Sequence, residues 1–122
     1  MVSHVEAIAQ GLKQLIEQVA GDVPVTFAGG SEDDGVGTSF EAVNQAIIDN
    51  EADEILAFYD LGSAKMNLEL AIESSDKSID LFDVAFIEGV YTAASLLQAD
   101  APTSAIKEEL DQLIVKLSLI HI

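Results

Sequence analysis

The sequence predicts an α/β domain of three layers, α/β/α, in which helices cover both faces of a central, mostly parallel sheet. Along its 122 residues, short runs rich in β-branched residues alternate with helical repeats of apolar residues, which is typical of strand–helix–strand units. Connections between parallel strands are right-handed crossovers, and we expect the strand order 2-1-3-4. Such sheets bind ligands at the carboxyl ends of their strands.

The first half of the chain alternates between these two patterns. Apolar side chains recur at helical spacing in two stretches, and β-branched residues gather between them. A loop with four glycines and three carboxylates covers residues 29–37. The expected elements are a very short strand at residues 1–3, a helix at 5–20, a strand at 23–28 and a helix at 38–50.

The second half continues the alternation. The nearly continuous apolar run at residues 54–59 predicts a strand buried on both faces. Because 122 residues suffice for one domain but not two, we expect a single domain over residues 1–117 and an unassigned tail at 118–122. The other expected elements are a helix after Asp60–Ser63, a strand at 79–84 extended by 85–87, a helix at 89–99, and a last helix capped by Thr103 or Ser104.

Apolar stripes on the expected helices identify a candidate core. Each stripe follows the spacing of one helix face. Its members are Ile8, Leu12, Leu15, Ile16 and Val19 in the first helix, Val43, Ala46 and Ile47 in the second, Met66 and Leu70 in the third, and Ile106, Leu110, Leu113, Ile114 and Leu117 in the last.

Composition narrows the classes of function. The chain has 22 acidic and five basic residues, all five of them lysine, for a net charge of −17. Nucleic acids and anionic membrane surfaces both attract cationic proteins, so we expect neither as a partner. The charge favours a basic protein partner met by long-range attraction, and solubility alone is the alternative.

Several kinds of chemistry are excluded or not expected. The absence of cysteine excludes disulfides, thiolate metal sites and cysteine nucleophiles. No P-loop or dinucleotide-binding pattern occurs, and no histidine–carboxylate cluster indicates zinc, so we expect no metal and no bound cofactor. The acidic loop at residues 32–34 lacks EF-hand spacing, and weak cation binding is its alternative. Neither a membrane span nor a signal sequence is recognisable, which makes the cytoplasm the expected compartment.

The candidate catalytic residues lie where strands end. His4 stands at a strand-to-helix junction, and a neutral imidazole is a competent nucleophile. Asp60 ends the strand at 54–59, which the order 2-1-3-4 places beside the first strand. A carboxylate on one ring nitrogen would fix the tautomer and leave the other nitrogen free to attack. Capping of the following helix is the alternative role for Asp60.

Hydroxyl side chains and a glycine stand at other helix starts on the same edge. Thr38, Ser39 and Ser63 either cap helices or donate hydrogen bonds to phosphoryl oxygens. Gly62 would let a ligand approach the backbone closely. We therefore expect a phosphoryl-binding edge around His4.

These pieces resemble a known family. Residues 2–4 (VSH), 37–39 (GTS) and above all 60–67 (DLGSAKMN) are similar to the phosphohistidine subunit of the bacterial phosphoenolpyruvate-dependent dihydroxyacetone kinase. That subunit has the fold of enzyme IIA of the mannose type, and the resemblance extends to about Lys116. Members carry more apolar residues ahead of the VSH motif, so the first strand is expected to be truncated here.

The resemblance implies a cytoplasmic phosphorelay. A histidine-containing phosphocarrier protein (HPr) would phosphorylate His4, with the phosphoryl group on Nε2, while Asp60 orients the ring. The group would then pass to ADP held with magnesium on the ADP-binding subunit of the kinase, so that this chain binds no cofactor. The family is usually a homodimer.

Three other functions remain open. A mannose-type enzyme IIA of sugar transport would use the same histidine but phosphorylate a IIB protein. A non-catalytic interaction module would keep the fold without carrying phosphate. A flavodoxin-like binder of small ligands is disfavoured, since tryptophan is absent and aromatic residues form only 6% of the chain.

Overall fold

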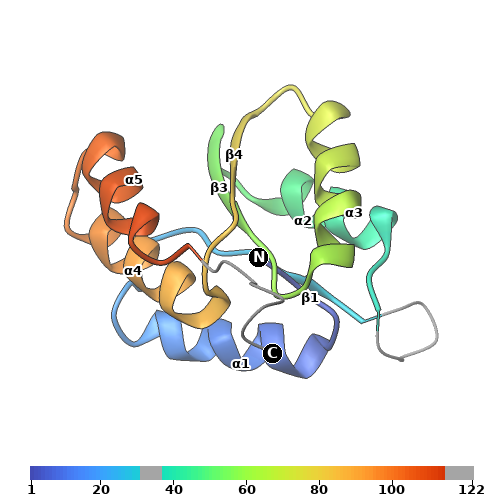
Figure 1. The fold of residues 1–122 in the computed structure, drawn as a ribbon, viewed down its shortest axis with the longest axis horizontal. Helices are drawn as coiled ribbons and strands as arrows, with labels where there is room; N and C mark the ends of the chain where they lie inside the picture. The colour runs from blue at the N-terminus through green and yellow to red at the C-terminus, as the bar shows by residue number, and fades with distance from the viewer. Residues whose placement is uncertain (31–36, 115–122) are drawn as a thin grey trace, which may run out of the picture.

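Strands and helices alternate along the part of the chain that the computed structural model describes, residues 1–30 and 37–114. Figure 1 shows the helices on either side of the strands. The elements are β1 (Val2–Ser3), α1 (Glu6–Glu17), β2 (Ala28–Gly29), α2 (Phe40–Asp49), β3 (Glu54–Phe58), α3 (Gly62–Glu73), β4 (Ser78–Phe82), α4 (Phe86–Gln98) and α5 (Thr103–Asp111).

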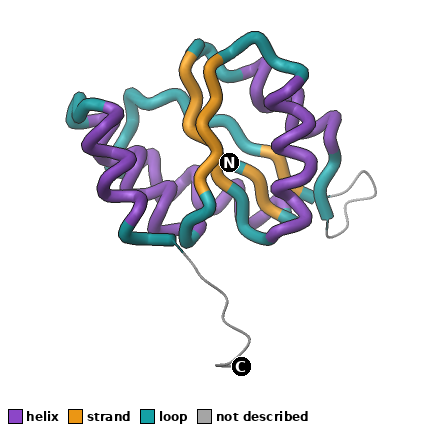
Figure 2. The backbone as a smooth tube through the Cα atoms, turned by 45° about the horizontal axis from the view of Figure 1, so that its top comes forward, coloured by secondary structure: helices purple, strands orange, loops and turns teal. Residues whose placement is uncertain are grey.

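The strands form two parallel pairs that meet at a single bridge. β1 pairs with β2 through Val2 and Ala28, and β3 pairs with β4 along its whole length. A parallel bridge between Val2 and Tyr59 joins the two pairs, which gives the expected order β2-β1-β3-β4 (Figure 2). All four strands therefore end at the same edge of the sheet.

Each face of the sheet has its own apolar core, which confirms the three-layer arrangement. α1, α4 and α5 pack with Phe58 on one face, and α2 and α3 pack with Val2 and Ala57 on the other. Burial of this apolar surface is the main force that holds the layers together. The stacked rings of Phe58 and Phe82, whose centroids are 5.5 Å apart, link β3 to β4.

The expected stripes of α1 and α3 are only partly buried, although Leu12 and Ile16 are buried as expected. In α1 the side chains of Ile8 and Leu15 are exposed, as is Val19 just after it, and in α3 Met66 and Leu70 are exposed. Alanines lie at the contact with the sheet instead, because they allow a helix to approach the strands closely. The buried residues are Ala9, Leu12 and Ile16 in α1, and Ala64, Leu68 and Ala71 in α3.

The expected strand at residues 23–28 is wrong except for its end. Only Ala28 and Gly29 form β2, because β1 offers two residues for pairing and Pro24 has no N–H to donate. The expected burial of residues 54–59 on both faces holds only for Ala57 and Phe58, since Glu54 is exposed.

Two expected boundaries near the carboxyl end are also wrong. Residues 85–87 do not extend β4, because α4 begins at Phe86, and the N–H of Gly89 donates to the carbonyl of Ala85 at 2.7 Å. Neither Thr103 nor Ser104 caps α5. The cap residue is Pro102, whose carbonyl accepts from the N–H of Ile106.

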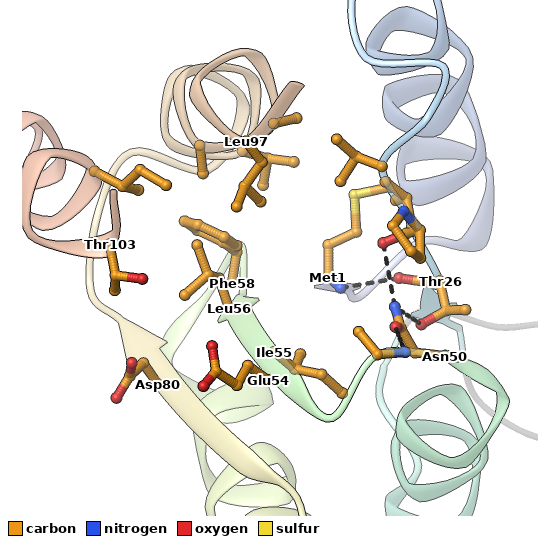
Figure 3. Close-up of a pocket in the computed structure, with 18 of the residues that line it drawn as sticks. Met1, Thr26, Asn50, Glu54, Ile55, Leu56, Phe58, Asp80, Leu97 and Thr103 are labelled. Atoms are coloured by element: carbon orange, nitrogen blue, oxygen red, sulfur yellow. Dashed lines mark hydrogen bonds between the residues drawn. The ribbon is translucent and has the colours of Figure 1, made fainter. Parts of the chain in front are cut away.

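A cavity of about 450 Å³ lies at the amino edge of the sheet, opposite the edge where the strands end. It separates the segment around Val25 from Leu56 and Phe58 of β3, and α4 and α5 close one side through residues that include Leu97 (Figure 3).

Further expectations concern membrane insertion, the domain limits and segments outside the described residues. None of the helices in the described part is long and apolar enough to cross a membrane. The expected domain end at residue 117, the tail at 118–122 and the buried position of Leu117 lie outside the described residues, as does the acidic loop at 32–34.

Candidate active site at the carboxyl edge of the sheet

His4 and Asp60 lie side by side because their strands end together. His4 directly follows β1, and Asp60 comes two residues after β3. The N–H of Asp60 donates to the carbonyl of Val2 at 3.1 Å, which continues the bridge between Val2 and Tyr59. The strand order thus places an imidazole and a carboxylate at one point of the edge.

The two side chains are in direct contact. Nδ1 of His4 lies 2.8 Å from Oδ1 of Asp60, and the side chains are only 12% and 16% exposed. A carboxylate accepts, so the shared proton belongs to Nδ1 of His4 when the ring is neutral. Nε2 then carries the free lone pair, which is the form that can attack an electrophile.

Four hydrogen bonds hold the carboxylate of Asp60. Oδ1 accepts from the ring of His4 and from the N–H of Leu61, the latter at 2.7 Å. Oδ2 accepts from the N–H of His4 at 3.0 Å and from the hydroxyl of Ser3 at 2.8 Å. Burial acts to raise the pKa of Asp60, but the hydrogen bonds from His4, Ser3 and Leu61 together lower that pKa below its ordinary value of 3.8. Asp60 is therefore ionised at neutral pH.

Ser63 reaches the other side of the imidazole. Its hydroxyl is within hydrogen-bonding contact of Nε2 of His4, on the exposed side of the ring. Gly62 and Ser63 are the first residues of α3, and first-turn amides have no partner inside a helix. A Cβ at Gly62 would meet nothing within 4 Å, so this side of Gly62 is open. Free amides and the positive end of the helix dipole suit an anion.

Thr38 and Ser39 approach the site from the loop before α2. The N–H of Gly37 donates to the carbonyl of His4 at 2.8 Å, which places Thr38 beside the histidine. The amide of Asn67 lies 2.6 Å from the hydroxyl oxygen of Thr38. The hydroxyl oxygen of Ser39 accepts from the N–H of Ala42 at 3.4 Å, which makes Ser39 the N-cap of α2.

Two glycines permit this close packing. Gly37 has φ 150°, a conformation that favours glycine. A Cβ on Gly29 would lie 2.6 Å from Cα of Glu6, so only glycine lets the end of β2 pass the start of α1.

Lys65, Asp83 and Tyr59 form a cluster beside the site in which the lysine is already paired. Nζ of Lys65 lies 3.1 Å from Oδ1 of Asp83, and the hydroxyl of Tyr59 donates to the same carboxylate at 2.5 Å. Burial, this hydrogen bond and nearby negative charges raise the pKa of Tyr59 to about 12. The positive charge of Lys65 is therefore neutralised locally rather than directed at His4.

All six site residues predicted from the sequence lie at this edge, although among the described residues only Asp60 and Ser63 are within hydrogen-bonding distance of the imidazole nitrogens. Sequence reasoning missed Ser3 and Asn67. A serine inside a short apolar strand was the available signal for Ser3, and the spacing of four residues from Ser63 on one helix face was the signal for Asn67. Across residues 1–30 and 37–114, no three histidine, aspartate or glutamate side chains form a group that could hold a metal ion.

The fold and this edge define a class of small α/β domains that present a carboxylate-paired histidine where parallel strands end. Within that class, the chain belongs to the family described as the PTS system fructose IIA component, whose model matches residues 1–107. The enzyme IIA fold expected from the VSH and DLGSAKMN motifs is therefore confirmed.

Relatives of known name support the closer resemblance. The chain is 50% identical over 116 residues to the PTS-dependent dihydroxyacetone kinase phosphotransferase subunit DhaM of Lactococcus lactis, covering 95% of this chain and 94% of that protein. It is 45% identical to the phosphoryl donor subunit DhaM of PEP-dependent dihydroxyacetone kinase 1 of Listeria innocua, again over 95% and 94%.

A solved structure supports the fold. The crystal structure of EF1359, a protein of unknown function, is similar with a TM-score of 0.77 at 28% identity, covering 95% of this chain and 93% of that one.

Proposed function

We propose that this chain is the phosphocarrier subunit of a phosphoenolpyruvate-dependent dihydroxyacetone kinase. The observation that carries the proposal is the contact of 2.8 Å between Nδ1 of His4 and Asp60, which leaves Nε2 at the exposed side beside Ser63. The names of the Lactococcus and Listeria relatives support the same activity.

The first step is phosphoryl acceptance. The lone pair of Nε2 attacks the phosphorus of the phosphohistidine of HPr, a new N–P bond forms, and the departing ring nitrogen of HPr keeps the electrons of the broken bond. Asp60 stabilises the positive charge that develops on the imidazole of His4. Thr38, Ser39, Ser63 and the amide of Gly62 receive the phosphoryl oxygens. The protein mainly positions groups and stabilises charge in such a transfer.

In the second step, the phosphoryl group leaves His4 and passes to ADP. A β-phosphate oxygen of ADP, held with magnesium on the ADP-binding subunit of the kinase, attacks the phosphorus, and the bond to Nε2 breaks to give ATP and free His4. This chain supplies no metal or nucleotide site in that step. Lys65 is already paired with Asp83 and does not retain the phosphoryl group, which suits a carrier that must release it.

The assembly belongs to the proposal too. We expect a cytoplasmic homodimer. Apolar side chains exposed on α1 and α4, among them Leu15 and Tyr91, support an interface of this kind. Sedimentation equilibrium at several concentrations tests it, and a monomer at all of them would contradict it.

The decisive experiment follows the phosphoryl group. The chain is incubated with phosphoenolpyruvate, enzyme I and HPr, and intact-mass spectrometry should show one added phosphoryl group, acid-labile and mapped to His4. His4→Ala should take none, and omission of HPr should give none. Failure of the folded protein to accept phosphate would favour a non-catalytic module.

The family description favours one alternative acceptor, a IIB protein of sugar transport. Phosphorylated chain is therefore mixed either with the ADP-binding subunit and magnesium ADP, or with a mannose-type IIB protein. Rapid loss of the label to ADP alone supports the kinase. Transfer to IIB alone would overturn that assignment while keeping the role of His4.

A further inference from the structure

Ser3 is a buried hydroxyl group directly behind the candidate site. It ends β1 and is 0% exposed. Its hydroxyl donates to Oδ2 of Asp60 at 2.8 Å, and its oxygen accepts from the N–H of Val5 at 3.1 Å. A buried hydroxyl is costly unless it is bonded in this way.

The hydrogen bond from Ser3 to Oδ2 completes the set of donors that orient the carboxylate of Asp60. A carboxylate has about four acceptor positions, and in Asp60 all four are used. Two of the donors are backbone amides, of Leu61 and His4, and a third is the ring of His4. Ser3 is the remaining donor, and together with the N–H of His4 it fixes Oδ2, so that Oδ1 stays directed at Nδ1.

We propose that Ser3 is a positioning residue that keeps His4 in the Nδ1–H tautomer. By holding Oδ2, Ser3 prevents rotation of the carboxylate about its Cβ–Cγ bond, and Oδ1 therefore remains the acceptor for the proton on Nδ1. The lone pair of Nε2 then stays available for attack. The consequence for transfer rests on the proposed function, whereas the tautomer of His4 does not.

The contact of Ser3 with Val5 suggests a competing, purely structural role at the start of α1. That role would contribute stability but would leave the imidazole unchanged. The two roles are separated by a readout on the ring itself, because ¹⁵N chemical shifts of the two ring nitrogens distinguish the tautomers. The signals of His4 are assigned by their loss in His4→Ala.

The experiment compares three variants of the full chain. Ser3→Ala removes the donor, Ser3→Thr keeps a hydroxyl, and Thr26→Val removes a hydroxyl that donates to the carbonyl of Ala46 at 2.7 Å, far from Asp60. Thr26→Val therefore reports what the loss of a part-buried hydroxyl does to stability alone. Unfolding by urea is measured for each, and the rates are taken under conditions where each is folded.

We expect Ser3→Ala to shift His4 toward a mixture of tautomers and to slow phosphoryl acceptance about 10- to 100-fold, the range seen when a partner that orients a ligating histidine is removed. Ser3→Thr should restore both, and Thr26→Val should change neither. A Ser3→Ala protein with the tautomer of the original chain would overturn the inference. If the original chain takes no phosphate, the proposed function fails, but the ¹⁵N shifts still test Ser3.

Discussion

The carboxyl and amino edges of the sheet are formed by the same strands but differ in what fills them. At the carboxyl edge, polar groups of His4, Asp60 and Ser3 pair with one another at hydrogen-bonding distance. At the amino edge, a cavity of about 450 Å³ is lined largely by apolar side chains, among them Leu56 and Leu97. This cavity is thus not the candidate site, which is marked by converging polar groups of fixed orientation.

The largest expected effect comes from removing the nucleophile at the carboxyl edge. In the proposed function His4 forms the bond to phosphorus, so His4→Ala should abolish phosphoryl acceptance rather than slow it. Intact-mass spectrometry over a long incubation measures this. Label on another residue of His4→Ala would show that the chemistry of this edge has been assigned to the wrong group.

Removal of the orienting carboxylate should have a smaller effect. Asp60→Asn keeps the size of the side chain but loses its charge, so the imidazolium that develops during transfer is no longer stabilised. We expect phosphoryl acceptance to fall by about 10²- to 10⁴-fold, measured by rapid quench with labelled HPr. An unchanged rate would mean that Asp60 does not assist the transfer and has only a structural role, in which it accepts a hydrogen bond from the N–H of Leu61.

A core substitution near the amino edge should separate stability from chemistry. Ile106 of α5 is fully buried and also lines the cavity. Ile106→Ala should lower the free energy of unfolding by about 2–5 kcal/mol, as measured by urea denaturation. The transfer rate of the folded fraction should stay the same, and a parallel fall in that rate would mean that the two edges are coupled.

The acid stability of the chain should depend on the carboxyl edge. Because the folded pKa of Asp60 lies below 3.8, its ionised form stabilises the fold above the pKa of the unfolded chain. This contribution is lost as the pH falls through the folded value. The difference in unfolding free energy between the original chain and Asp60→Asn should therefore shrink as the pH falls below about 3.8. A constant difference from pH 6 to pH 3 would contradict this.

The smallest effect is expected from the rim of the cavity. Leu97 is 38% exposed and lines the cavity at the amino edge. Leu97→Gln should leave phosphoryl acceptance unchanged and alter stability by at most about 0.5 kcal/mol, as is usual for exposed positions. A marked loss of transfer would show that the cavity takes part in function.

The carboxyl edge was the more predictable of the two. Alternating strands and helices predict a parallel sheet, and the expected order 2-1-3-4 places Asp60 next to His4. Ser3 could not be found in this way, because a hydroxyl in a strand shows no periodicity that indicates its partner. The proposed role of Ser3 depends on its hydrogen bond to Oδ2 of Asp60, which only the structure shows.

The core was predicted less well, for two physical reasons. Helical spacing cannot decide which of two neighbouring stripes faces the sheet, and the large residues Ile8 and Leu15 are exposed while Ala9 is buried. Pairing also depends on the partner strand, so the β-branched run at residues 23–28 forms a strand only where β1 lies beside it.

The distance along the chain between the site residues has a consequence for folding. Asp60 and Ser63, which contact the side chains of Ser3 and His4, come 56 to 59 positions later in the sequence than these partners. Contacts so distant require closure of a long loop, which costs chain entropy and forms slowly. During synthesis His4 leaves the ribosome long before Asp60 and Ser63, so a nascent chain has an imidazole without its partners. In the proposed function, phosphoryl acceptance therefore arises only when the sheet closes.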